Sequence, residues 1–228
     1  MRTLSVRSLA GLALPDFCPR CFWVLERLEG KPPYQLSFPS IFNDIDKHTK
    51  ALVRAALGRD GSPPAWFPLG PIQEFLPEGQ LHWSRFTLQD PSTGLKLRGV
   101  PDEVLRLADG SWHIVDYKTA RITAGQDELL PLYEIQLNAY AWIAEGLGYK
   151  PVSGLSLLYL EPQVGAGAGD AGLILPFEAV HRPVALRLER IPELLRQAHG
   201  LLQLNDPPAG ASGCRECRQL GRLLDLLG

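Results

Sequence analysis

The chain lacks several features that mark whole classes of protein. No apolar run reaches the roughly 18 residues that a membrane-spanning helix needs, and no internal repeat is visible. Positive charge is not in excess, because 23 Lys and Arg stand against 25 Asp and Glu. With 45% hydrophobic and 21% charged residues, the composition excludes a disordered, collagen-like or coiled-coil chain. We expect one globular domain over residues 1–228, with its core at about 41–204 and no membrane partner.

The N-terminal segment and the cysteines indicate the cellular compartment. Residues 1–15 hold two arginines and only a short, broken apolar stretch, without a small-residue cleavage site after them. We therefore expect no signal peptide and a cytoplasmic protein. Cytoplasmic thiols are normally reduced, which makes disulfides an unfavourable interpretation of the four cysteines.

The cysteines form two C-x-x-C pairs, Cys18 with Cys21 and Cys214 with Cys217. Four thiolates can hold a zinc ion or an iron–sulfur cluster. Such a site would join segments 16–23 and 212–220 and so bring the two ends of the chain together. Buried inert cysteines and redox-active thiols are the alternatives.

Hydrophobic periodicity and turn residues predict a mixed α/β fold, with a mixed central sheet flanked by helices. The predicted helices span residues 41–57, 131–145 and 184–204. The predicted strands span residues 81–88, 95–107, 112–118, 153–160 and 173–180. A β-hairpin is expected where Ala108-Asp109-Gly110-Ser111 joins two of these strands.

Acidic residues and a lysine flank this hairpin. Asp116 and Lys118 are two positions apart on a strand and therefore share a face. A two-residue turn would place Glu103 opposite Asp116, whereas a three-residue loop at residues 108–110 would place Asp102 there. We predict the three-residue loop, a common bulged hairpin with glycine in the left-handed position. Two carboxylates could then hold Mg²⁺, and a lysine could orient or deprotonate water, as metal-assisted phosphodiester hydrolysis requires.

Three segments resemble motifs of the PD-(D/E)XK nuclease superfamily, specifically its RecB-like branch. They are Gly99-Val100-Pro101-Asp102, Asp116-Tyr117-Lys118-Thr119 and Gln136-Leu137-Asn138-Ala139-Tyr140. The last segment corresponds to the Q-x-x-x-Y signature of that branch. The resemblance implies a restriction-endonuclease-like fold.

The resemblance also implies roles for single residues. Asp102, Asp116 and the backbone carbonyl of Tyr117 become ligands of Mg²⁺ or Mn²⁺, and Lys118 becomes the catalytic lysine. Gln136 and Tyr140, one helical turn apart, become residues that position the substrate.

Many members of the branch carry a further metal-binding histidine on an N-terminal helix. His48 is the candidate in this chain. Asp44, Asp46 and Lys50 on the same helix could equally face the site.

The terminal cysteines resemble those of the iron–sulfur members of the branch. Those members usually have one cysteine near the start of the chain and three near the end, whereas this chain has two and two. We expect a 4Fe–4S cluster, with Zn²⁺ as the alternative.

These features together predict a metal-dependent DNA nuclease. The net charge of −2 argues against tight unassisted binding of long duplex and favours single strands or ends. Arginines such as Arg54 and Arg59 are candidates for phosphate contacts. Because the chain has no helicase motif, we expect a helicase or a repair or recombination protein as partner. The rival interpretations are a non-catalytic nucleic-acid-binding protein with the nuclease fold and a thiol or cluster redox protein.

Overall fold

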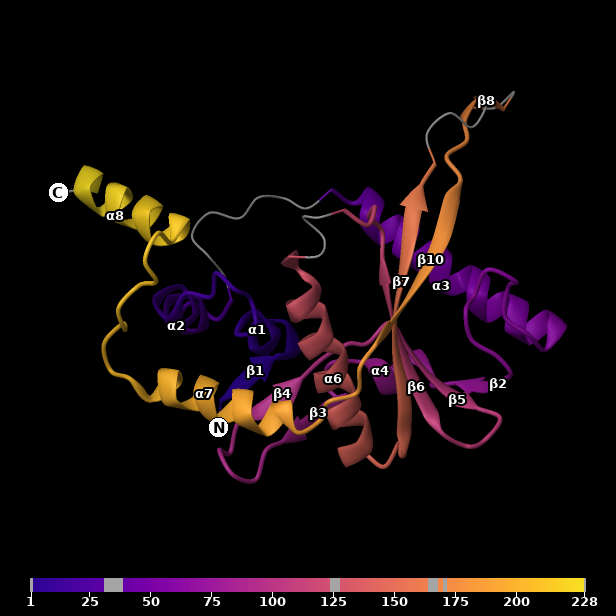
Figure 1. Ribbon diagram of the computed structural model, residues 1–228, viewed down its shortest axis with the longest axis horizontal. Coiled ribbons are helices and arrows are strands. Elements are labelled where there is room, and N and C mark those ends of the chain that lie inside the picture. The colour runs from indigo at the N-terminus through magenta and orange to yellow at the C-terminus, as the bar shows by residue number, and fades with distance from the viewer. Residues whose placement is uncertain (1, 31–38, 124–127, 164–167, 170–171, 228) are drawn as a thin grey trace.

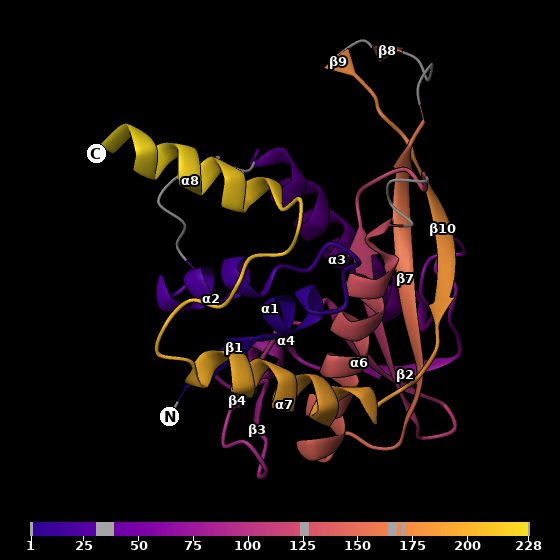
Figure 2. The same ribbon diagram turned by 60° about the vertical axis from the view of Figure 1, so that its left-hand side comes forward.

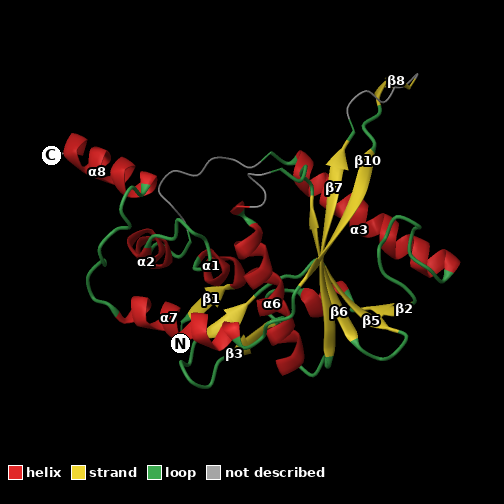
Figure 3. Ribbon diagram, in the orientation of Figure 1, coloured by secondary structure: helices red, strands yellow, loops and turns green. Residues whose placement is uncertain are grey.

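The computed structural model describes residues 2–30, 39–123, 128–163, 168–169 and 172–227. In this part of the chain, a mixed central sheet is flanked by helices, which confirms the predicted fold class (Figures 1 and 3). None of the described helices is long and apolar enough to cross a bilayer.

The main sheet has the strand order β10-β7-β6-β5-β2. Its strands are β2 (Ile72–Phe75), β5 (Glu103–Leu107), β6 (Trp112–Lys118), β7 (Val152–Pro162) and β10 (Phe177–Val184). β6 and β7 run parallel, and the other neighbouring strands run antiparallel. A parallel pair needs a crossover connection, which α6 (Leu130–Gly146) supplies.

A smaller sheet has the order β1-β4-β3. It consists of β1 (Thr3–Ser5), β3 (Thr87–Gln89) and β4 (Lys96–Arg98), while β8 (Ala168–Gly169) pairs with β9 (Gly172–Leu173). The other helices are α1 (Val6–Gly11), α2 (Pro19–Arg27), α3 (Ile41–Asp60), α4 (Glu78–Leu81), α7 (Arg190–Gln203) and α8 (Arg215–Leu227).

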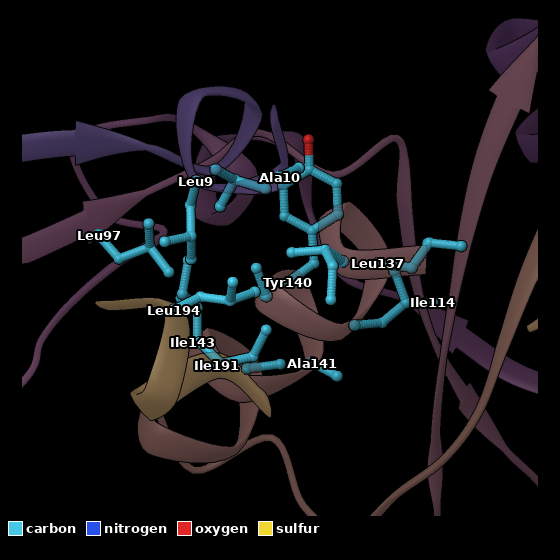
Figure 4. Close-up of a cluster of buried hydrophobic side chains, with 14 of the residues drawn as sticks. Leu9, Ala10, Leu97, Ile114, Leu137, Tyr140, Ala141, Ile143, Ile191 and Leu194 are labelled. Carbon is cyan, nitrogen blue, oxygen red and sulfur yellow. The ribbon is translucent and has the colours of Figure 1, made fainter. Parts of the chain in front are cut away.

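Helices cover both faces of the main sheet. On one face α1, α6 and α7 enclose an apolar cluster that includes Ile114 of β6 (Figure 4). On the other face Val53 of α3 belongs to a second cluster with Val115 of β6. Because side chains alternate along a strand, β6 serves both layers, and its carboxyl end lies between α3 and α6.

Several predicted elements need correction. The predicted strand 95–107 is two strands, because the chain leaves the small sheet after β4 and enters the main sheet at β5, with Pro101 lacking an N–H between them. Most of the predicted strand 81–88 is the end of α4 and a turn. The last main-sheet strand is β10 rather than residues 173–180, so the helix predicted from residue 184 begins only at Arg190.

The β5–β6 hairpin has the predicted register. Glu103 pairs with Val115 and Arg106 with Trp112, as the three-residue loop requires. Gly110 has the left-handed φ of 84°, and its N–H donates to the carbonyl of Leu107 at 2.9 Å. Continued by one position, this register sets residue 102 opposite residue 116.

The two ends of the chain lie on the same side of the molecule. α2, near the N-terminus, contacts both α7 and α8, near the C-terminus (Figure 2). This arrangement brings the two cysteine segments together, as predicted.

A chain of polar side chains crosses three strands of the main sheet. Ser156 Oγ of β7 lies 2.9 Å from His113 Nε2 of β6 and 2.8 Å from His181 Nε2 of β10. Gly154 makes room for the His113 ring, because a Cβ at position 154 would collide with that ring. Burial, and secondarily the neighbouring His181, lowers the pKa of His113 to about 4.

We expect this buried histidine to make the fold sensitive to acid. Its folded pKa lies below the roughly 6.5 of an unfolded histidine, so its contribution is present above that value and is lost as the pH falls toward 4. His113→Gln should flatten the pH dependence of the unfolding free energy over this window, as measured by urea denaturation. The exposed His82 provides the control variant His82→Gln. A slope unchanged by His113→Gln would contradict this account.

Candidate active site

The carboxyl end of β6 brings together the aspartates and the lysine predicted from the sequence. Lys118, the last residue of β6, places its ammonium group against the carboxylate of Asp116. Asp102 directly precedes β5, and its Oδ2 accepts a hydrogen bond from the backbone N–H of Tyr117 at 2.8 Å. This bond joins Asp102 to Tyr117 near the end of β6. The backbone carbonyl of Tyr117 is the third predicted metal ligand.

Asp116 is the most buried member of the group, with 4% of its surface exposed. Burial raises its pKa to about 6, while Lys118 lowers it and Asp102 raises it further. Asp116 Oδ2 accepts no hydrogen bond from the described residues, although the Lys118 ammonium contacts it. Two carboxylates beside a backbone carbonyl are hard oxygen donors of the kind that Mg²⁺ and Mn²⁺ prefer. The residues present therefore fit a divalent cation.

The first half of α6 presents a row of polar side chains to the aspartates. Gln136 Nε2 donates to Asp116 Oδ1 at 3.1 Å and to Tyr140 Oη at 3.0 Å. Gln136 thus contacts both Asp116 and Tyr140, as the i,i+4 spacing of Gln136 and Tyr140 allows. Lys118 Nζ lies 4.3 Å from the ring centre of Tyr133. Tyr133 is not among the residues predicted from the sequence, although its position three residues before Gln136 places it on the same helix face.

Gly99 has a steric role in the same site. A Cβ at this position would collide with the ring of Tyr140 and would touch Val6 of α1. The glycine three residues before Asp102 therefore lets the chain pass close to α6.

The helix that carries His48, α3, contributes Lys50 and Asp46 to the site. Lys50 Nζ of α3 lies 2.7 Å from Asp102 Oδ1 and 2.8 Å from Asp46 Oδ2. His48 is two residues from both Asp46 and Lys50, which places it about 200° around the helix axis. It is exposed and lines a separate groove of about 710 Å³ beside β10. The helix thus turns His48 away from Asp102, and its role as a metal ligand stays a prediction that this geometry does not favour.

Glu103, the neighbour of Asp102, points into the layer beneath α3. It is fully buried and bound by Arg54, whose Nη2 lies 2.5 Å from Oε2 and whose Nε lies 3.2 Å from Oε1. Burial raises the pKa of Glu103 to about 7, although Arg54 lowers it. Arg54, expected as a phosphate contact, instead neutralises this buried carboxyl group.

Removing Arg54 should leave a buried carboxylate without its partner. We expect Arg54→Met to cost about 3–5 kcal/mol of unfolding free energy. The matched control is Arg59→Met, which removes an exposed arginine paired with Asp60 and should leave the unfolding free energy almost unchanged. Adding Glu103→Leu to Arg54→Met should recover stability. Equal costs for the two arginine variants in urea denaturation would refute this role.

The four cysteines form a second candidate site, away from the sheet. Cys18 and Cys214 directly precede α2 and α8, and Cys21 and Cys217 lie in the first turns of these helices. The sulfur atoms of Cys18 and Cys217, and those of Cys21 and Cys214, are 3.5 Å apart. All four sulfur atoms lie within 4.8 Å of one another.

The surroundings of the Cys18 sulfur favour a thiolate, whereas burial raises the pKa of Cys21 and of Cys217. Burial alone raises the pKa of Cys18, but hydrogen bonds, foremost from the backbone N–H of Ala211, outweigh it and bring the pKa to about 6. Helix N-termini also favour negative charge. A Cβ at Gly210 would lie 2.9 Å from the sulfur of Cys217, so the glycine lets the backbone approach closely. The four residues fit a thiolate-bound metal.

Comparison with known proteins identifies the family. Residues 44–219, well over half of the chain, match the model of the PD-(D/E)XK nuclease superfamily. The chain therefore belongs to this superfamily. The matched region contains both aspartates, Lys118 and the second cysteine pair, whereas the first cysteine pair precedes it.

Solved structures that resemble the chain include SSO0001, with 17% sequence identity and a TM-score of 0.46 over 90% of this chain and 78% of that one. They also include an alkaline exonuclease, LHK-Exo, from Laribacter hongkongensis, with 11% identity and a TM-score of 0.43 over 99% of this chain and 95% of that one. No curated protein matches the chain.

Proposed function

We propose that the protein is a metal-dependent nuclease that hydrolyses phosphodiester bonds of DNA. The observation that carries the proposal is the convergence of Asp102, Asp116 and Lys118 at the end of β6. Asp102, Asp116 and the carbonyl of Tyr117 would hold Mg²⁺ or Mn²⁺, which supplies Lewis-acid stabilisation and a more acidic water when bound.

The chain's own residues have separate tasks in this proposal. The Lys118 ammonium, held by Asp116 and the Tyr133 ring, orients the attacking water and offsets the charge that develops on the phosphate. Gln136 holds Asp116 Oδ1 and so fixes the orientation of that carboxylate, with Tyr140 holding Gln136 in turn. Gln136 and Tyr140 are therefore positioning residues.

The substrate preference is inferred from charge. A net charge of −2 gives little general attraction to duplex DNA, so we propose action on single strands or ends, with a helicase or repair protein as partner. A cytoplasmic location stays a prediction. The intact group of two aspartates and a lysine argues against the rival of a non-catalytic nucleic-acid-binding protein.

Substitution of the proposed catalytic residues should abolish cleavage. We expect Lys118→Met and Asp116→Asn each to lower the rate of DNA cleavage in Mn²⁺ by at least about 100-fold, because they remove charge stabilisation and metal binding. Lys47→Met, which removes an exposed lysine of α3, is the control and should retain activity.

The assay compares single-stranded, blunt-ended and circular DNA, with gel analysis of the products. Cleavage that is equal in wild type and Lys118→Met would contradict the proposed site. DNA binding without cleavage in Mg²⁺ or Mn²⁺ would favour the non-catalytic rival.

For the cysteine site, we propose one zinc ion rather than the 4Fe–4S cluster expected from the resemblance. Zinc–sulfur bonds of about 2.3 Å in a tetrahedron place sulfur atoms about 3.8 Å apart. The separations here are 3.5, 3.5 and 3.6 Å for three of the pairs. A cluster with four irons inside the ligand shell needs sulfur atoms much farther apart than the 4.8 Å that encloses all four. The zinc would fasten α2 to α8, which also disfavours a redox role.

Metal analysis tests this assignment. Protein purified without oxygen should be colourless and contain one zinc per chain. Cys217→Ser should lose the zinc and unfold at a lower temperature, because the metal would no longer join α2 to α8. Ser212→Ala, an exposed change in the same segment, is the control and should keep the zinc. Brown protein that contains iron and absorbs at about 400 nm would overturn the zinc assignment in favour of a cluster.

A further inference from the structure

Both carboxylate oxygens of Asp102 already have partners. Oδ2 accepts the N–H of Tyr117 at 2.8 Å, and Oδ1 lies 2.7 Å from the ammonium of Lys50. The backbone bond belongs to the fold of the hairpin, whereas Lys50 reaches in from α3 on a long side chain. A divalent cation that binds Oδ1 therefore competes with the ammonium for the charge of this oxygen.

Lys50 also has a second partner that would let it move. Asp46, one turn earlier on α3, lies 2.8 Å from the same ammonium and is 37% exposed at its side chain. The Lys50 side chain is itself 23% exposed, so it has room toward solvent. Lys50 could leave Asp102 and still keep an ion pair within its own helix.

The charges of the side chains around Asp102 also imply competition between the lysines and a metal ion. Asp46, Asp102 and Asp116 carry three negative charges, against two positive charges from Lys50 and Lys118. Without a metal ion, the lysines neutralise most of the site, and a cation with two charges must compete with them.

We infer that Lys50 is a built-in counter-cation that occupies the ligand oxygen of Asp102 in the metal-free protein and must shift to Asp46 when a divalent cation binds. The inference rests on the proposed function, because it assumes that Asp102 is a metal ligand. Lys50 thereby sets the metal concentration at which the site fills, and Asp46 serves as the alternative partner of the lysine rather than as a ligand.

Titration calorimetry with MnCl₂ tests the inference without measuring activity. Lys50→Met should bind Mn²⁺ about tenfold more tightly or better, because an ammonium this close changes the affinity of a carboxylate for a competing cation by about 10- to 1,000-fold. Lys50→Arg keeps the charge and should bind close to the wild-type affinity. Lys47→Met removes the same charge from the exposed face of α3 and is the matched control.

A second pair of variants separates the two roles of Asp46. Asp46→Asn in the wild-type background should weaken Mn²⁺ binding, because Lys50 then has Asp102 as its remaining partner. The same change in Lys50→Met should alter the affinity by less than about threefold, since no lysine is left to be held. Equal weakening in both backgrounds would overturn the inference and make Asp46 a ligand.

The outcomes distinguish the inference from the proposed function. If Asp116→Asn abolishes Mn²⁺ binding but Lys50→Met binds no more tightly than wild type, the competition by Lys50 is refuted and the metal site stands. If wild type and Lys50→Met bind no Mn²⁺, or Asp116→Asn binds it as well as wild type, the metal site itself is refuted, and the inference with it.

Discussion

The candidate site depends on the pairing of one β-hairpin. The three-residue loop with Gly110 in the left-handed conformation sets the register of β5 against β6. That register, together with the hydrogen bond from Tyr117 N–H to Asp102, places two aspartates side by side at the end of a buried strand. A slip of one residue would exchange the layers of every side chain on β5. It would bring Glu103 toward Asp116 and leave Asp102 on the other face.

Two neighbouring acidic residues consequently have different partners. Asp102 meets Lys50 at the end of β6, where solvent reaches it, whereas Glu103 is buried beneath α3 and paired with Arg54. One helix thus serves both layers, because Lys50 and Arg54 are one turn apart on α3. The carboxylate of Glu103 is completely buried, whereas that of Asp102 is 19% exposed.

Local patterns in the sequence were sufficient to predict which side chains of the candidate site share a face of one strand or one helix. Asp116 and Lys118 share a face because they are two apart on a strand, and Gln136 and Tyr140 because they are four apart on a helix. The same reasoning could have found Tyr133, but could not choose among Asp46, His48 and Lys50. That choice depends on the rotation of α3 about its axis, which is set by the packing of Val53 against the sheet.

By itself, the sequence determined β6 and α6 at the site, the hairpin register and the pairing of the cysteines into two C-x-x-C units. These depend on interactions between residues close in the chain, such as turn chemistry and side-chain periodicity. Only the tertiary structure decided which charges meet: Lys50 with Asp102, Arg54 with Glu103, and four sulfur atoms close enough for a single ion. These contacts join residues about 50 to 200 positions apart, and their distances depend on how α2, α3 and α8 pack, which no local pattern specifies.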